Sequence, residues 1–144
     1  MRIYAHRGYR QGGHLPENTI PAFAAAVQQG ADGVEFDVQL SKDGKAVIFH
    51  DNSLHKVGIP KLLHDMSSDE LQQVELGKEI FLPMLDEVLE RFGNSTFLNI
   101  ELKSPNAASE VARLLHEYEL DLSPNHLIVS SSYRSRRLLP SGRR

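Results

Sequence analysis

The sequence predicts an α/β domain built around a parallel sheet. Short apolar runs of strand length alternate along the chain with segments whose apolar residues recur at helical spacing. Glycines and capping residues mark the ends of these segments. The 144 residues suit a single domain, and 40% hydrophobic with 24% charged residues is an ordinary globular composition. We therefore expect one folded unit over residues 1–132 and a divergent basic tail over residues 133–144.

The first half of the chain is expected to hold three strands and one helix. Three runs have strand length and composition: residues 2–5, 33–40 and 46–49. The last two are joined by a turn that ends in Asp43 and Gly44, a pair that favours tight turns. Between the first two runs, apolar residues have the spacing of one buried helix face: Ile20, Phe23, Ala24 and Val27. Asn18 or Thr19 is expected to cap this helix, and Gly30 to end it.

The second half is expected to continue the alternation. After a loop at residues 52–66, Ser67 and Glu70 have the spacing of a capping box at the start of a short helix. Apolar residues at helical spacing mark two longer helices: Leu85, Val88, Leu89 and Phe92, then Val111, Leu114, Leu115 and Tyr118. Ser104 and Pro105 are expected to open the second of these helices. Strands are expected at residues 97–102 and 127–130.

Composition and charge narrow the class of function. Sixteen Lys and Arg against nineteen Asp and Glu give a formal charge of −3, which argues against a nucleic-acid binder and a polybasic membrane binder. The chain has no cysteine, so disulfides, thiolate metal sites and cysteine nucleophiles are excluded. It has no apolar run long enough to span a bilayer, and its N-terminal residues turn polar too early for a secretory signal. We therefore expect a soluble, cytoplasmic protein with no nucleic-acid partner.

Polar and titratable residues gather at the C-terminal ends of the predicted strands. Four strands carry them in pairs: His6 and Arg7, Glu35 and Asp37, His50 and Asp51, and Glu101 and Lys103. In a parallel α/β array the carboxyl ends of the strands meet at one mouth, where ligands bind. The sequence therefore predicts a polar site at that mouth.

Glu35 and Asp37 are the strongest candidates for metal binding. Because side chains alternate along a strand, these two carboxylates face the same side. Two like charges this close need a counter-ion or a proton, and a divalent cation with Glu101 as a third oxygen ligand would satisfy them. The alternative is that one of the pair faces solvent or meets an Arg, since Glu-x-Asp occurs often by chance.

The other polar residues at this mouth suit acid–base and phosphate chemistry. His6 and His50 could act as general base and general acid, and two hydrogen-bonded core histidines are the alternative. Arg7 and Lys103 add positive charge, so the site suits an anionic, phosphate-like substrate better than an acyl group. The chain lacks a G-x-S-x-G elbow and a phosphate-binding glycine loop, which argues against a serine hydrolase and against ATP or NAD.

Several short motifs follow one another along the first 132 residues. They are His6-Arg7-Gly8, Pro16-Glu17-Asn18-Thr19, Glu35-Phe36-Asp37-Val38, Lys42-Asp43-Gly44, His50-Asp51 and Asn99-Ile100-Glu101-Leu102-Lys103. Each motif alone is weak, but their order and spacing together closely resemble the glycerophosphodiester phosphodiesterase family.

The resemblance implies a fold, a reaction and a set of roles. Members of that family are TIM barrels that hydrolyse glycerophosphodiesters to an alcohol and glycerol 3-phosphate with a divalent cation. The implied roles are acid–base catalysis by His6 and His50, phosphate contact by Arg7 and Lys103, and metal binding by Glu35, Asp37 and Glu101. The resemblance favours Mg²⁺, with Ca²⁺ as the alternative ion, and a small-molecule glycerophosphodiester as the substrate.

The length of the chain sets a limit on this resemblance. A TIM barrel has eight strands in about 250 residues, whereas this sequence supplies about five. We therefore expect a truncated barrel whose first and last strands keep unpaired edges, through which the chain could self-associate. The alternative function is a catalytically silent fragment that acts only as a metal-binding or self-associating module.

Overall fold

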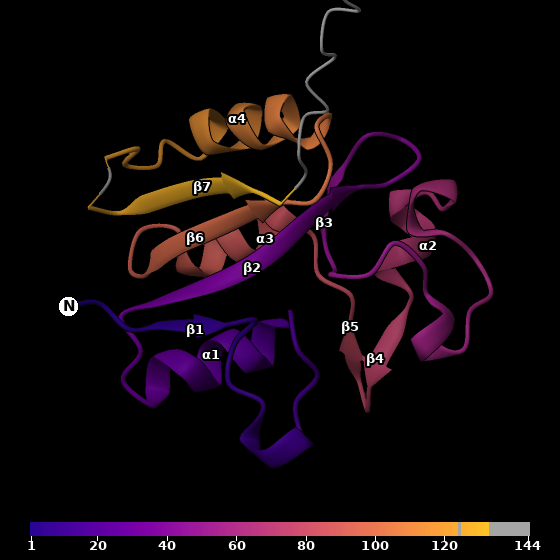
Figure 1. Cartoon of the computed structure of the whole chain (residues 1–144), viewed down its shortest axis with the longest axis horizontal. Coiled ribbons are helices and arrows are strands. Elements are labelled where there is room, and N and C mark those ends of the chain that lie inside the picture. The colour runs from indigo at the N-terminus through magenta and orange to yellow at the C-terminus, as the bar shows by residue number, and fades with distance from the viewer. Residues whose placement is uncertain (124, 133–144) are drawn as a thin grey trace, which may run out of the picture.

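A five-stranded sheet forms the centre of the fold (Figure 1). The computed structural model describes residues 1–123 and 125–132, and the predicted basic tail at 133–144 lies outside the described residues. Four strands pair in parallel in the order β1 (Tyr4–His6), β2 (Gly33–Leu40), β6 (Phe97–Leu102) and β7 (Leu127–Ser131). Each lies beside the next parallel strand along the chain, as in part of a TIM barrel. The predicted α/β fold with about five strands is confirmed.

The first strand is displaced from its predicted position. It begins at Tyr4 instead of Arg2 and extends to His6, which pairs with Glu35 of β2. His6 is therefore part of the sheet, next to a carboxylate of the acidic pair.

The strand before His50 runs in the direction opposite to the prediction. β3 (Ala46–Ile48) is antiparallel to β2, with Ile48 opposite Val38. Since β6 occupies the other edge of β2 at this point, β3 lies on the same edge as β1. The cause is the tight turn at residues 41–44, where Gly44 has φ +78°, because a parallel neighbour would need a long crossover. His50 therefore returns along β2 and does not end a parallel strand.

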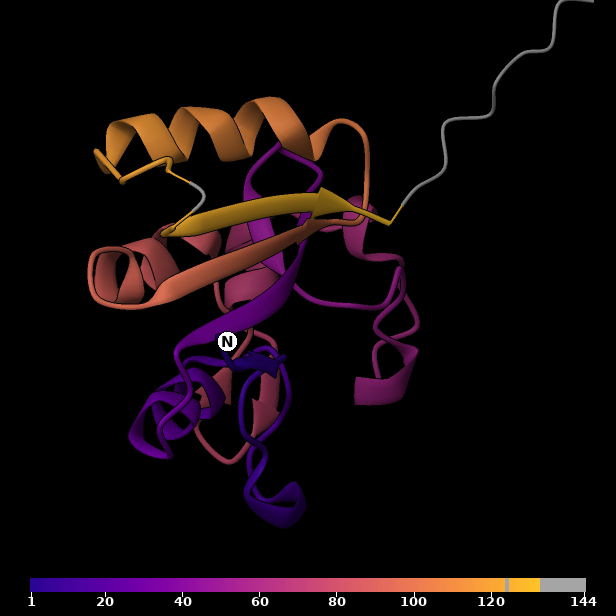
Figure 2. The ribbon, with the colours of Figure 1, turned by 60° about the vertical axis from the view of Figure 1, so that its left-hand side comes forward.

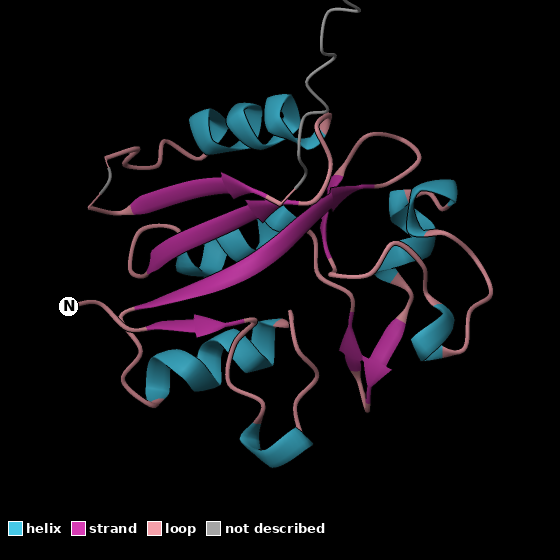
Figure 3. Ribbon diagram, in the orientation of Figure 1, coloured by secondary structure: helices cyan, strands magenta, loops and turns pink. Residues whose placement is uncertain are grey.

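Three helices cover one face of the sheet, as the cyan ribbons of Figure 3 show. They are α1 (Ile20–Gln28), α3 (Leu85–Phe92) and α4 (Ala107–Glu117). Their apolar faces form one core with alternate residues of the strands, such as the fully buried Phe36 and Ile100. Figure 2 shows α4 running alongside β7. Since side chains alternate along a strand, the other face of the sheet receives the polar residues between these core positions.

The observed helix starts agree with two of the three predicted caps. The Thr19 hydroxyl accepts a hydrogen bond from the Ala22 amide at the start of α1, and Ser67 caps α2 (Ser68–Gln72). The prediction that Ser104 and Pro105 open α4 is wrong. The Ser104 carbonyl accepts a hydrogen bond from the amide of Ala107, so these residues form a turn that ends where the helix begins.

The segment between β3 and α3 forms a small separate layer. The predicted loop at 52–66 contains two short 3-10 helices, His55–Val57 and Leu63–Asp65. A third 3-10 helix, Gln11–Gly13, follows β1. An unpredicted hairpin of β4 (Glu75–Gly77) and β5 (Ile80–Phe81) follows α2. The fully buried Leu54 and Leu71 belong to a second apolar cluster in this layer. None of the helices in the described part of the chain has the length and apolar character needed to cross a membrane.

Candidate active site

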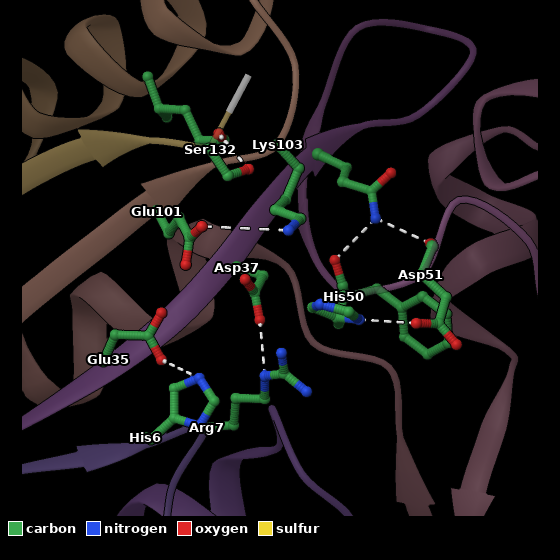
Figure 4. Close-up of polar contacts among 12 residues, drawn as sticks. His6, Arg7, Glu35, Asp37, His50, Asp51, Glu101, Lys103 and Ser132 are labelled. Atoms are coloured by element: carbon green, nitrogen blue, oxygen red, sulfur yellow. Dashed lines mark hydrogen bonds and ion pairs between the residues drawn. The ribbon is translucent and has the colours of Figure 1, made fainter. Parts of the chain in front are cut away.

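Three carboxylates from two neighbouring strands meet on the polar face of the sheet (Figure 4). Glu35 and Asp37 lie two residues apart on β2, and the parallel register places Glu101 of β6 opposite Asp37. One oxygen from each of the three carboxylates lies within 4.8 Å of the other two. The alternation of side chains that the sequence predicted for Glu35 and Asp37 is therefore present, and the sheet register adds the third carboxylate.

Two of the three carboxylates in the acidic cluster are buried, and Glu101 is partly exposed. Asp37 is 0% exposed and Glu35 is 8% exposed. Burial, followed by the nearby charge of Asp37, raises the pKa of Glu35 from 4.5 to about 7. Asp37 Oδ1 and Glu35 Oε2 are buried without a hydrogen-bond partner among the described residues. Unpartnered carboxylate oxygens that converge on one point are the donor set of a hard divalent cation, so the residues present fit such an ion.

Asp37 also meets an arginine, which was the alternative left open by the sequence. Arg7 Nε lies 3.2 Å from Asp37 Oδ2, and Asn18 Nδ2 donates a hydrogen bond to the same oxygen at 3.0 Å. Glu17 holds the other side of Arg7 through an ion pair of 2.7 Å. Because both partners use Oδ2, the arginine and a cation at Oδ1 do not exclude each other.

The two candidate histidines lie on either side of the Arg7–Asp37 pair (Figure 4). His6 Nε2 lies 3.5 Å from Glu35 Oε2, and 69% of the His6 side chain is exposed. His50 Nδ1 lies 2.6 Å from Asp51 Oδ1. This hydrogen bond is the main cause that lowers the pKa of Asp51, and Lys56 adds an ion pair on its other oxygen. The ionised Asp51 favours a proton on Nδ1 of His50, which leaves Nε2 for other partners.

Lys103 lies at the same edge of the sheet. Its Nζ is 4.0 Å from Glu101 Oε1, and its amide donates a hydrogen bond to the Val38 carbonyl. Lys103 and His50 line one open hollow of about 550 Å³. A smaller cavity of about 170 Å³ joins His50 to Asn18 and to the apolar Phe49. All seven residues predicted from the sequence therefore surround one region.

The sequence did not predict three of the supporting contacts. Asn18 was a candidate helix cap, but Thr19 takes that position and Asn18 is free to reach Asp37. Asp51 was noted as a polar strand end without a role. Gln39 was not considered, although its position two residues after Asp37 puts it on the same face of β2.

The chain is similar to known proteins of one enzyme family. The model of the glycerophosphoryl diester phosphodiesterase family matches residues 6–138. A glycerophosphodiester phosphodiesterase of Bacillus altitudinis is 34% identical over 145 residues, which cover 90% of this chain and 57% of that protein.

Two solved structures share the fold. The glycerophosphodiester phosphodiesterase of Agrobacterium tumefaciens has a TM-score of 0.82 and 30% identity, covering 92% of this chain and 58% of its own. An Oleispira antarctica phosphodiesterase in complex with the product sn-glycerol-3-phosphate has a TM-score of 0.77 and 32% identity. The match covers 91% of this chain and 57% of the Oleispira antarctica chain. This chain thus spans less than two thirds of the length of these relatives. Since the family match covers most of the sequence and includes every residue of the acidic cluster, the chain belongs to the glycerophosphoryl diester phosphodiesterase family.

Proposed function

We propose that this chain carries the catalytic site of a metal-dependent phosphodiesterase that hydrolyses glycerophosphodiesters to an alcohol and glycerol 3-phosphate. The observation that carries the proposal is the cluster of three carboxylates, two of them buried, with His6 and His50 on either side of the Arg7–Asp37 pair. Family membership and the product bound to the Oleispira antarctica relative support the choice of substrate.

In this proposal Glu35, Asp37 and Glu101 hold the divalent cation. Asp37 Oδ1 and Glu35 Oε2, which are buried and make no hydrogen bond among the described residues, support this assignment. Mg²⁺ is the proposed ion, with Ca²⁺ as the alternative. When bound, the cation would supply positive charge to the phosphodiester oxygens and to the oxygen that attacks phosphorus.

Arg7 and Lys103 are proposed to bind the phosphate. The planar guanidinium of Arg7 is held on both sides by carboxylates, which supports a fixed orientation toward the acidic cluster. Among residues 1–123 and 125–132, the single ion pair of Lys103 Nζ is the long contact with Glu101, so its charge is available to an anion in the hollow.

His6 and His50 are proposed as the acid–base pair. One imidazole takes a proton from the attacking water, or from the glycerol hydroxyl next to the phosphate, and the other donates a proton to the leaving alkoxide. If the glycerol hydroxyl attacks, the first product is a cyclic phosphodiester, which water then opens to glycerol 3-phosphate. The Asp51 contact supports a role for His50 through Nε2, because it holds the proton on Nδ1. The exposure of His6 supports access to substrate.

A direct test measures release of glycerol 3-phosphate from glycerophosphocholine with MgCl₂ or with EDTA. The proposal expects activity only with the cation, and a fall of at least about 100-fold in kcat for His6→Ala and for His50→Ala. His116→Ala, on an exposed position of α4, is the matched control and should keep wild-type activity. Wild-type activity in either active-site variant, or full activity in EDTA, would contradict the proposal.

The second candidate function is a silent module that binds metal or self-associates. The feature that favours it is β7, which has β6 as its only partner among residues 1–123 and 125–132, and exposes Ile128 and Val129 by 41% and 45%. Pairing of β7 with β1 of a second copy would cover both strand edges and bring the four parallel strands of each copy together. Light scattering after size-exclusion chromatography, run with the activity assay, separates the cases: a soluble, inactive species favours the silent module. Cytoplasmic location stays a prediction, which cell fractionation would test.

A further inference from the structure

Gln39 connects the strand of the acidic cluster to the backbone around His50. It follows Glu35 and Asp37 on the same face of β2 and is 8% exposed. Its Nε2 donates one hydrogen bond to the Phe49 carbonyl and another to the Asp51 carbonyl, both at 2.8 Å. One side-chain amide therefore uses both of its donor hydrogens on the two peptide carbonyls that flank His50.

These two bonds are the main attachment of the His50 segment. The chain leaves the β3 ladder after Ile48, and the next contact with β2 is the hydrogen bond from the Phe49 amide to the Asp37 carbonyl at 3.1 Å. In the part of the chain that the structure describes, the His50 backbone makes no hydrogen bond. The carbonyls of Phe49 and Asp51 accept hydrogen bonds from Gln39 alone. Gln39 therefore makes two of the three hydrogen bonds that join residues 49–51 to β2 among the described residues.

We propose that Gln39 is a positioning residue that sets the place of the His50 imidazole relative to the acidic cluster. Glu35 and Asp37 belong to the same strand as Gln39, so a bond from Gln39 to the His50 segment links the two parts of the site through one rigid element. The proposal rests on the proposed function, because it assigns His50 to the proton transfers. Displacement of a reacting group by about 1 Å can lower a rate by roughly 100-fold, so such a link affects turnover.

Two substitutions test this role. Gln39→Met removes both donors at similar length and volume, and Gln39→Glu keeps the shape but presents acceptors to the two carbonyls. Gln28→Met makes the same chemical change at an exposed position of α1 and is the matched control. Both Gln39 variants should lose at least about 10-fold in kcat for glycerophosphocholine. Their KM and their midpoint for MgCl₂ should stay within about twofold of wild type, because the phosphate and metal contacts remain.

A second readout does not depend on activity. Nitrogen–proton correlation spectra of the imidazoles should show wild-type His50 in one tautomer with the proton on Nδ1, facing Asp51. In Gln39→Met, His50 should populate both tautomers, while the exposed His116 keeps its wild-type signals.

Each outcome decides the proposal. Either a wild-type kcat or an unchanged His50 tautomer in Gln39→Met would overturn it. A loss of kcat that comes with a matching loss of MgCl₂ binding would also overturn it, because Gln39 would then support the whole site and not His50 in particular. If wild-type protein releases no glycerol 3-phosphate, the proposed function fails, and the tautomer comparison still decides whether Gln39 positions His50.

Discussion

Replacement of Glu35 by Gln should change stability in opposite directions without and with a divalent cation. Glu35 and Asp37 are buried beside the partly exposed Glu101, and in EDTA no divalent cation would neutralise the three carboxylates. The amide of Gln has the same shape as the carboxyl group, carries no charge and can donate hydrogen bonds to the other two carboxylates. The free protein should therefore become more stable, while stabilisation by the cation should disappear.

The size of the first effect follows from the pKa of Glu35. Its rise from 4.5 to about 7 corresponds to roughly 3 kcal/mol of unfavourable free energy once the buried group is ionised. Below the unfolded pKa of 4.5 the group is protonated in both states and Glu35 adds no penalty. As the pH rises through 7 the penalty becomes complete. Because the two neighbouring carboxylates and His6 share the site, we expect about 1–3 kcal/mol of stabilisation in Glu35→Gln near pH 8 and almost none near pH 4.

The assay is urea unfolding followed by circular dichroism, in EDTA and in MgCl₂. For wild type, a cation at about 100 times its Kd should add roughly 2.7 kcal/mol to the free energy of unfolding. This gain should grow as the pH rises through 7, because the cation competes with the proton on Glu35. Glu35→Gln should show little or no gain from MgCl₂ at any pH.

The matched control is Glu90→Gln, on an exposed position of α3. It should unfold like wild type in EDTA and keep the full response to MgCl₂. The reasoning is refuted if Glu35→Gln is less stable than wild type in EDTA near pH 8, or if MgCl₂ stabilises both proteins equally.

Three further substitutions separate catalysis from stability. Asp51→Asn removes the carboxylate that holds the proton on His50 Nδ1, so kcat for glycerophosphocholine should fall by at least about 100-fold; a wild-type kcat would exclude this orienting role. Loss of the charged contacts with His50 and Lys56 should lower the free energy of unfolding by no more than about 1 kcal/mol. Asp43→Ala removes hydrogen bonds from Ser41 and Ser68 that hold the pKa of Asp43 well below its usual range. At neutral pH, urea unfolding should show that the free energy of unfolding falls by about 1 kcal/mol in this variant. The difference from wild type should shrink at low pH, as acid protonates Asp43 in the wild-type protein. An equal loss at all pH values would contradict the electrostatic account. Phe36→Ala opens the core beside Phe23 and should cost about 3–5 kcal/mol in the same assay; a loss below about 1 kcal/mol would show that the core collapses around the gap.

Local patterns in the sequence were sufficient for most of the fold. The strands over 33–40 and 97–102 were predicted with their observed bounds, and the four apolar residues that predicted the next helix all lie in α3. Apolar periodicity and turn residues act over a few positions, so these elements can be read without knowing their neighbours. The predictions were wrong where a boundary or a direction depends on other segments, as at the start of α4 and in the direction of β3.

For the site, the sequence by itself determined which side chains are present and that Glu35 and Asp37 share a face. Only the tertiary structure decided that Glu101 lies opposite Asp37, that Asn18 bonds Asp37 instead of capping a helix, and that Gln39 holds the segment of His50. The physical reason is range. Side-chain alternation is a property of a single strand, whereas a hydrogen bond between residues 10 to 19 positions apart exists only once strand register and burial bring its two atoms within about 3 Å.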